Sequence, residues 1–110
     1  MRITSELFVA QLVRRLFSAG SFAAVMRRGA DAAGAIFVVA RSRDGGITLF
    51  GPAVQSLAED DGGRRFMAEQ AADEAALDAR FLREARFDPD FWVVEIETDA
   101  PETFIDVVEA

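Results

Sequence analysis

The chain has 110 residues, 51% of them hydrophobic, and carries a formal net charge of −7. It contains no Cys, His, Lys, Tyr or Asn, so it lacks the side chains that most often act as nucleophile, acid or base near neutral pH. It also lacks the thiolate and imidazole ligands of zinc, copper, haem and iron–sulfur sites. Carboxylates, hydroxyls, arginines and the backbone remain for chemistry, and no cofactor is expected.

Length and composition predict one domain over residues 1–110, with a core and no linker. The charge is unevenly distributed: residues 1–57 sum to +4 and residues 58–110 to −11. The longest apolar run, Gly34–Ala40, is too short to span a bilayer. The absence of cysteine fits a reducing compartment, so we expect a cytoplasmic protein that does not bind membranes.

The first predicted element is a helix that Thr4 caps and that continues to about Ser18, with Gly20 as its stop. Apolar residues recur in it at helical spacing and are expected to face the core. They are Phe8, Leu12, Val13, Leu16 and Phe17.

Two strands are predicted next, over Phe22–Arg28 and Ala35–Arg43, with Gly29–Gly34 as a tight connection between them. Asp44-Gly45-Gly46 is a strong turn signal, and the returning strand follows over Ile47–Gly51.

Pro52–Gly63 reads as a loop with an acidic patch at 59–61, and Arg64–Glu69 as a short strand. A second helix is predicted from the cap Asp73 through Arg86. Its inward residues are expected to be Leu77, Phe81, Leu82 and Ala85. A further strand is predicted over Phe91–Glu97, and Thr103–Val108 is expected to be another strand or a short helix.

Short connections between the predicted strands favour antiparallel pairing. The fold class expected is therefore α+β with two layers: a mostly antiparallel sheet of about five strands, and two helices packed on one of its faces.

Four carboxylates lie within ten residues near the C-terminus: Asp88, Asp90, Glu95 and Glu97. Such a group is what Mg²⁺ or Mn²⁺ needs, and it would suit a metal-dependent phosphodiesterase or nuclease. A strand advances about 3.3 Å per residue, however, which separates Asp90 from Glu95 by about 16 Å. The structural interpretation places Trp92, Val94 and Ile96 in the core and the two glutamates on the opposite, solvated face.

Arginines form the second candidate site, because guanidinium groups bind phosphate bidentately. The candidates for nucleotide or nucleic-acid binding are Arg14, Arg15, Arg27, Arg28, Arg41 and Arg43. The net charge of the chain disfavours nucleic acid. Arginine is also the only basic side chain present, so these residues must supply every ion pair of the protein.

Several segments together resemble a family of short alphaproteobacterial proteins classed as a domain of unknown function. They are Glu6–Val9 with Arg14-Arg15, then Arg27–Gly29, Ala33–Val38 and, most specifically, Phe87–Glu97. The resemblance implies a stand-alone bacterial domain and carries no functional residues over. From the residues, the leading hypothesis is a non-catalytic binding module. Its expected partner is a protein, either another chain or a second copy held through a sheet edge or an apolar helix face.

Overall fold

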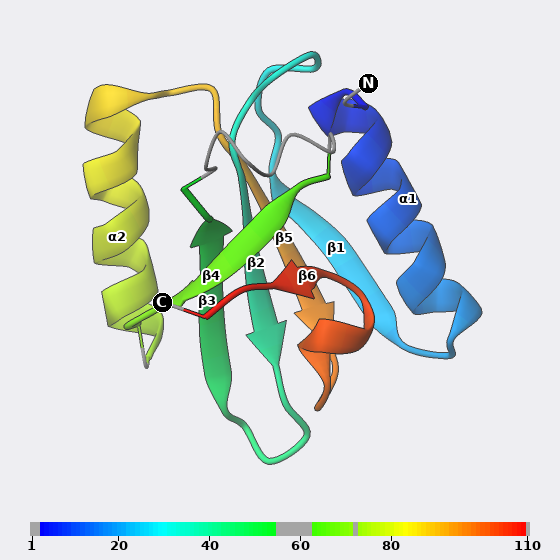
Figure 1. Cartoon of the computed structure of the whole chain (residues 1–110). Coiled ribbons are helices and arrows are strands. Elements are labelled where there is room, and N and C mark those ends of the chain that lie inside the picture. The colour runs from blue at the N-terminus through cyan, green and yellow to red at the C-terminus, as the bar shows by residue number, and fades with distance from the viewer. Residues whose placement is uncertain (1–2, 55–62, 72, 110) are drawn as a thin grey trace.

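The computed structural model describes residues 3–54, 63–71 and 73–109, so the acidic patch predicted at 59–61 lies outside the described residues. The described residues form two α-helices and one sheet, arranged as in Figure 1. The elements are α1 (Ser5–Ser18), β1 (Phe22–Arg27), β2 (Ile36–Arg41), β3 (Ile47–Pro52), β4 (Arg65–Glu69), α2 (Glu74–Phe87), β5 (Trp92–Glu97), a 3₁₀ turn (Pro101–Thr103) and β6 (Asp106–Val107). Of the segment 103–108, for which a strand or a short helix was expected, Thr103 ends the 3₁₀ turn and only Asp106 and Val107 form a strand.

Helix α1 begins and ends as its sequence predicts. The hydroxyl of Thr4 accepts a hydrogen bond from the backbone N–H of Leu7 at 3.2 Å, and Gly20 has a φ of 78° beyond the last turn. The buried face consists of Ser5, Val9, Leu12 and Leu16. Phe17, predicted to face inward, is 54% exposed, so that prediction is wrong. Its ring lies 5.8 Å from that of Phe22 at the start of β1.

Within the part of the chain that the structure describes, the sheet has six strands in the order β1-β5-β2-β3-β4-β6. Three neighbouring pairs are antiparallel, whereas β2/β5 and β4/β6 are parallel. The predicted α+β class with two helices is confirmed, but the sheet is mixed and has one more strand than expected. β5 lies between β1 and β2, so 29–34 is not a hairpin turn. A strand as apolar as β5 gains most from a central position, because neighbours then cover it on both sides.

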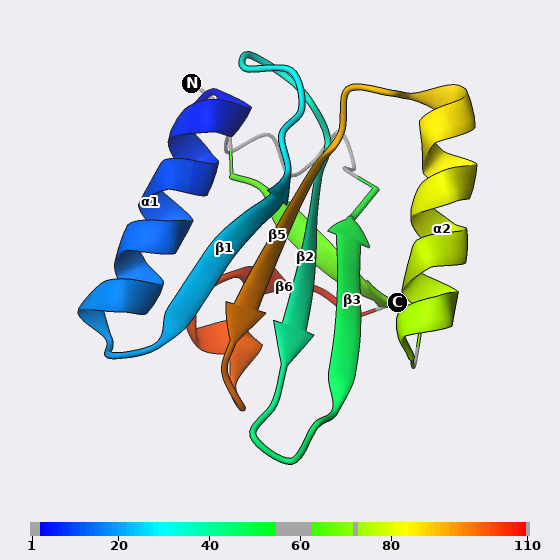
Figure 2. The ribbon, with the colours of Figure 1, turned by 180° about the vertical axis from the view of Figure 1, so that it is seen from behind.

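The two helices pack on opposite faces of the sheet, so the prediction of two layers with both helices on one face is wrong. Ile36, Val38 and Ala40 of β2 join the core beneath α1, whereas Phe37 and Val39 join the core beneath α2. Five successive buried residues in one strand require cover on both faces. Figures 1 and 2 show α1 and α2 flanking the sheet on its two sides.

The core on the α1 side is the larger one, because β4 and β6 fold over it (Figure 1). Phe66 of β4 and Ile105 are buried there together with Trp92. In the part of the chain that the structure describes, no helix is long and apolar enough to cross a membrane.

On the α2 side, Phe37, Phe81 and Phe91 pack with ring centroids 5.6–6.0 Å apart. Leu77 and Ala85 face the sheet as predicted. Leu82 is 69% exposed, which makes its predicted inward position wrong.

Candidate functional site

The C-terminal carboxylates are dispersed in the structure. Glu95 and Glu97 lie on the α2 side of β5, opposite the buried Trp92, Val94 and Ile96, as predicted. That face is not solvated throughout, however: α2 covers part of it, and the Glu95 side chain is only 18% exposed, so the prediction of a solvated face is wrong for Glu95. The carboxylate of Asp88 accepts a hydrogen bond from the backbone N–H of Asp90 at 3.0 Å, which shapes the turn before β5. Across residues 3–54, 63–71 and 73–109, no three acidic side chains gather in a way that could hold a metal ion.

This dispersion predicts that divalent cations leave the stability of the protein unchanged. A ligand that binds only the folded state must raise the melting temperature. We expect the melting temperature in 5 mM Mg²⁺ or Mn²⁺ to stay within about 1 °C of its value in EDTA. A rise that grows with metal concentration, and that Asp90→Asn with Glu97→Gln abolishes, would restore the metal hypothesis.

The six candidate arginines do not form one cluster. β1 runs antiparallel to β5 and β5 runs parallel to β2, so the ends of β1 and β2 lie at opposite ends of the sheet. Arg27 and Arg28 are therefore far from Arg41 and Arg43. Arg14 lies exposed on α1. The arrangement gives no support to a phosphate-binding surface built from all six.

Most of these arginines make local structural contacts. Arg28 forms ion pairs with Glu6 and Asp31 and lies 5.0 Å above the ring of Trp92. Arg15 donates a hydrogen bond to the backbone oxygen of Phe104 at 2.7 Å. The α1 helix is thereby tied to the β1 end and to the segment before β6.

A β-bulge aims Arg27 at the turn before β5. The register between β1 and β5 shifts between Val25 and Arg27, which places Arg27 opposite Val93 on the α2 side. From there its guanidinium lies 4.1 Å from the centre of the Phe91 ring. It donates hydrogen bonds to the backbone oxygens of Pro89, at 2.7 Å, and Phe91, at 3.2 Å. Met26 is the extra residue of the bulge.

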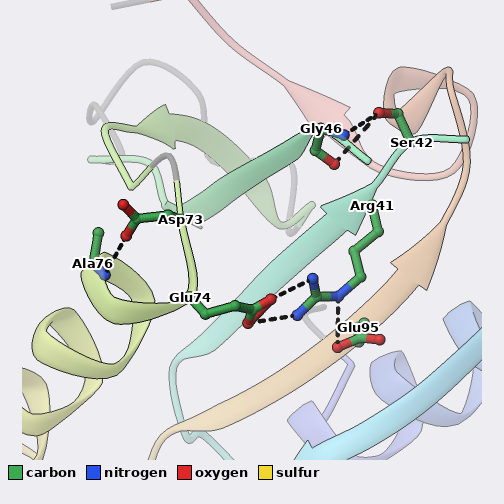
Figure 3. A network of polar contacts seen from close by, with 7 residues as sticks. All are labelled: Arg41, Ser42, Gly46, Asp73, Glu74, Ala76 and Glu95. Carbon is green, nitrogen blue, oxygen red and sulfur yellow. Dashed lines mark hydrogen bonds and ion pairs between the residues drawn. The ribbon is translucent and has the colours of Figure 1, made fainter. Parts of the chain in front are cut away.

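Arg41 joins three elements at the other end of the sheet (Figure 3). Its guanidinium bonds both carboxylate oxygens of Glu74 in the first turn of α2, at 2.6 and 2.9 Å. Its Nε lies 3.0 Å from Glu95 on β5, whose side chain is only 18% exposed. The pKa of Glu74 is lowered by these hydrogen bonds, and the pKa of Arg41 is raised by the two carboxylates. The network anchors α2 to the centre of the sheet.

The ionisable groups predict a broad plateau of stability against pH. Without His, Cys, Lys or Tyr, only the α-amino group titrates between the carboxyl range and that of arginine. Glu74 has a folded pKa below its ordinary value of 4.5, so the unfolded chain binds its proton more readily. Its stabilising contribution is complete above about pH 4.5 and is lost as pH falls through the folded pKa.

We therefore expect the urea midpoint of unfolding to be constant between about pH 6 and pH 11 and to fall below about pH 4.5. Glu74→Gln should reduce the part of the acid loss that comes from this group. A midpoint that changes steeply between pH 6 and pH 9 would contradict this account of the charges.

A hollow of about 740 Å³ lies where the parallel strands β2 and β5 end. Arg41, Arg43 and Glu97 line it, so the structure does bring these three candidate residues together. Phe22 and Asp99 border it as well, and Asp99 accepts a hydrogen bond from the backbone N–H of Arg43 at 2.8 Å. Two arginines and two carboxylates thus line the hollow, so the charges of its lining balance.

Exposed apolar side chains along the β1 margin of the sheet were not singled out by the sequence. They are Phe17 at the end of α1 and Phe22, Val25 and Met26 on β1, with exposed fractions between 44% and 61%. In the register with β5, Phe22 lies opposite Glu97 and Val25 opposite Val94, so these two point to opposite faces of the sheet. We call these four residues the edge patch. Their exposure was unpredicted for different reasons: Phe17 has helical core spacing, whereas nothing in a strand of small and apolar residues such as β1 tells whether it lies inside a sheet or at its margin.

Comparison with protein families identifies the family of this chain. The model of the family described as "Protein of unknown function (DUF1491)" matches residues 3–106. The chain belongs to the DUF1491 family. The resemblance to a bacterial family of unknown function is thus confirmed. No curated protein matches the chain.

Solved structures of DUF1491 relatives share the whole fold. The solution structure of protein Atu0922 from A. tumefaciens is 50% identical with a TM-score of 0.87, over 100% of this chain and 98% of that one. A crystal structure of a DUF1491 family protein from Caulobacter crescentus is 39% identical with a TM-score of 0.78, over 96% and 99%. An NMR structure from the same organism is 38% identical with a TM-score of 0.79, over 98% of both chains.

Proposed function

We propose that this DUF1491 chain is a non-catalytic protein-binding module and that its binding surface is the outer edge of β1 with the edge patch. The observation that carries the proposal is the position of β1. It is the terminal strand of the sheet, and among the described residues it pairs with β5 alone. Its six residues therefore offer backbone groups on one side to an added strand.

The side chains around this edge support the same reading. Met26 is 61% exposed, and Val25 and Phe22 are nearly half exposed, although all three are residue types that are usually buried. Phe17 and Phe22 contact each other edge to face, with a centroid distance of 5.8 Å. Apolar side chains grouped on a surface mark protein contacts more often than isolated ones do. An extended segment along β1 would cover these side chains while its backbone pairs with the strand.

The other two hypotheses draw no comparable support from the described residues, because the arginines make separate structural contacts and the carboxylates are dispersed. We place the module in the cytoplasm, in keeping with a cysteine-free chain.

A photo-crosslinking amino acid at position 26 tests the proposal in living cells. Its matched control is the same amino acid at position 82, which is comparably exposed but lies on α2. We expect a discrete covalent adduct from position 26 and none of that mass from position 82. Equal labelling from the two positions, or no adduct from position 26, would contradict the proposed surface.

A further inference from the structure

We propose that α2 is a detachable cover of the sheet. It leaves as one unit while α1 and the strands stay folded, and its departure uncovers an apolar face of β2, β3 and β5. Figure 2 shows α2 beside β3, with α1 beyond β1 on the far side of the sheet. The movement does not involve the outer edge of β1, so it goes beyond the proposed function and is tested separately from it.

The two helices have the same length but differ in how much apolar surface they bury. α1 has 14 residues, of which four are buried, whereas α2, all 14 residues of which the structure describes, buries Leu77 alone. Phe81 and two alanines of α2 are partly buried, and Leu82 and Phe87 are exposed. A helix is held on a sheet mainly by the apolar area that it removes from water. α2 is therefore held less firmly than α1.

Two arginines attach α2 to the strands through polar contacts. Arg41 of β2 binds Glu74 in the first turn of the helix (Figure 3), and Arg80 in the middle of the helix donates a hydrogen bond to Glu69 of β4 at 2.7 Å. The Glu74 side chain is 62% exposed. Ion pairs at such exposure contribute little to stability, because water solvates both charges. These contacts position α2 without compensating for its small buried surface.

The chain that follows α2 is fixed to the sheet by contacts in which the helix has no part. Arg27 of β1 donates hydrogen bonds to the backbone oxygens of Pro89 and Phe91. The indole N–H of Trp92 donates to the backbone oxygen of Ala30. β5 can therefore keep its place between β1 and β2 when the helix moves away.

The rest of the fold has a core of its own on the α1 side of the sheet. Each of the five longer strands contributes a buried side chain to it, namely Ala23, Val38, Phe50, Phe66 and Trp92 in the order β1 to β5. No residue of α2 belongs to this core. Opening of α2 therefore costs less free energy than global unfolding, which must break both cores.

Release of α2 changes the surface that the protein presents. Phe37, Val39, Leu49, Phe91 and Val93 lie beneath the helix, and each is at most 5% exposed while it is in place. Contiguous apolar surface of this kind marks sites of protein interaction. The position of α2 thus determines whether this face of the sheet is available for contact.

Two neighbouring positions of β2 provide a matched test in a chain without cysteine. Val39 belongs to the core beneath α2 and Val38 to the core beneath α1, and both are buried. We expect the single thiol of Val39→Cys to react with a chromogenic disulfide reagent at least tenfold faster than that of Val38→Cys. The reason is that opening of α2 exposes position 39, whereas only global unfolding exposes position 38.

A second substitution identifies the element that opens. In the Val39→Cys background, Leu77→Ala should accelerate labelling about tenfold or more, because its contacts exist only while α2 is closed. Leu12→Ala, equally buried but on α1, should leave the labelling rate within about twofold, since the α1-side core is intact in both states. Circular dichroism checks that each variant is folded, and Val9→Ala is the milder substitution in the same core.

Equal labelling at positions 38 and 39 would overturn the proposal, and so would equal acceleration by Leu12→Ala and Leu77→Ala. Either result means that α2 opens only with the whole protein. Hydrogen exchange of the wild-type chain tests the same point without a variant. Amides of α2 should exchange at least tenfold faster than the slowest amides of β2 and β5, with a smaller dependence on urea. Equal rates and equal urea dependence would also overturn it.

Discussion

Gly29→Ala is expected to destabilise the protein by about 2–4 kcal/mol, lowering its melting temperature by about 10 °C or more. A Cβ at position 29 would lie 2.3 Å from the backbone oxygen of Asp90 and 2.7 Å from Cδ1 of Trp92. The same oxygen accepts a hydrogen bond from the N–H of Ala30 at 2.9 Å, so it cannot withdraw without breaking that bond. Thermal or urea unfolding of the variant measures the loss.

Gly45→Ala is the matched control. Gly45 has a φ of 92° in the hairpin turn, and a Cβ there meets no atom within 4 Å. Its substitution costs only the backbone strain of a left-handed conformation, about 1 kcal/mol. If Gly29→Ala proves no more costly than Gly45→Ala, then segment 29–34 is not packed against the turn before β5 as described.

Within Phe87–Glu97, the segment that most resembles the family, Trp92→Ala should be the most destabilising substitution. We expect it to lower the free energy of unfolding by about 3–5 kcal/mol. Trp92 is 1% exposed within the α1-side core, and its indole N–H donates to the backbone oxygen of Ala30 at 2.8 Å. Since small domains have total stabilities of about 5–15 kcal/mol, much of the folded population could be lost at moderate urea. Urea titration followed by circular dichroism measures it.

Two variants separate the sources of this loss. Trp92→Phe keeps most of the ring but leaves the oxygen of Ala30 without its donor, so we expect a loss of about 1–3 kcal/mol. Asp90→Asn, two residues away and exposed, should change stability by less than about 0.5 kcal/mol. A large loss of stability from Asp90→Asn, together with a small loss from Trp92→Ala, would contradict the conclusion that this segment stabilises the core.

Local structure could be predicted from sequence because its causes are local. Thr4 and Asp73 cap their helices through hydrogen bonds to backbone N–H groups three residues later. The turn at 44–46 joins β2 to β3 as expected, with Gly45 at positive φ. The order of the strands in the sheet, in contrast, could not be predicted from local sequence. The insertion of β5 between β1 and β2 depends on contacts between residues more than fifty positions apart, which no local pattern encodes.

The sequence did contain one signal for the three-layer arrangement. Residues 36–40 are apolar at every position, which is typical of a strand covered on both faces. Interpreting that run in terms of short connections alone led to two helices on one face.

For the candidate site, only the orientation of the side chains along β5 could be predicted from the sequence. The strand geometry of Trp92, Val94 and Ile96 correctly indicated that Glu95 points to the opposite face of β5, but not that α2 covers this face. The partners of the arginines depend on tertiary contacts, such as that of Arg41 with Glu74 across the sheet. The edge patch could not be predicted from sequence, because an exposed methionine such as Met26 differs from a core methionine only in its burial.

The most direct test of the account is amide hydrogen exchange of β1, compared between the free chain and the chain bound to its protein partner. The account predicts that backbone amides within 22–27 exchange several-fold more slowly once the edge is covered, whereas those of α2 over 74–87 keep their rates. Identical exchange of β1 in the two states, with protection appearing over α2 or β4 instead, would contradict the claim that the outer edge of β1 is the binding surface.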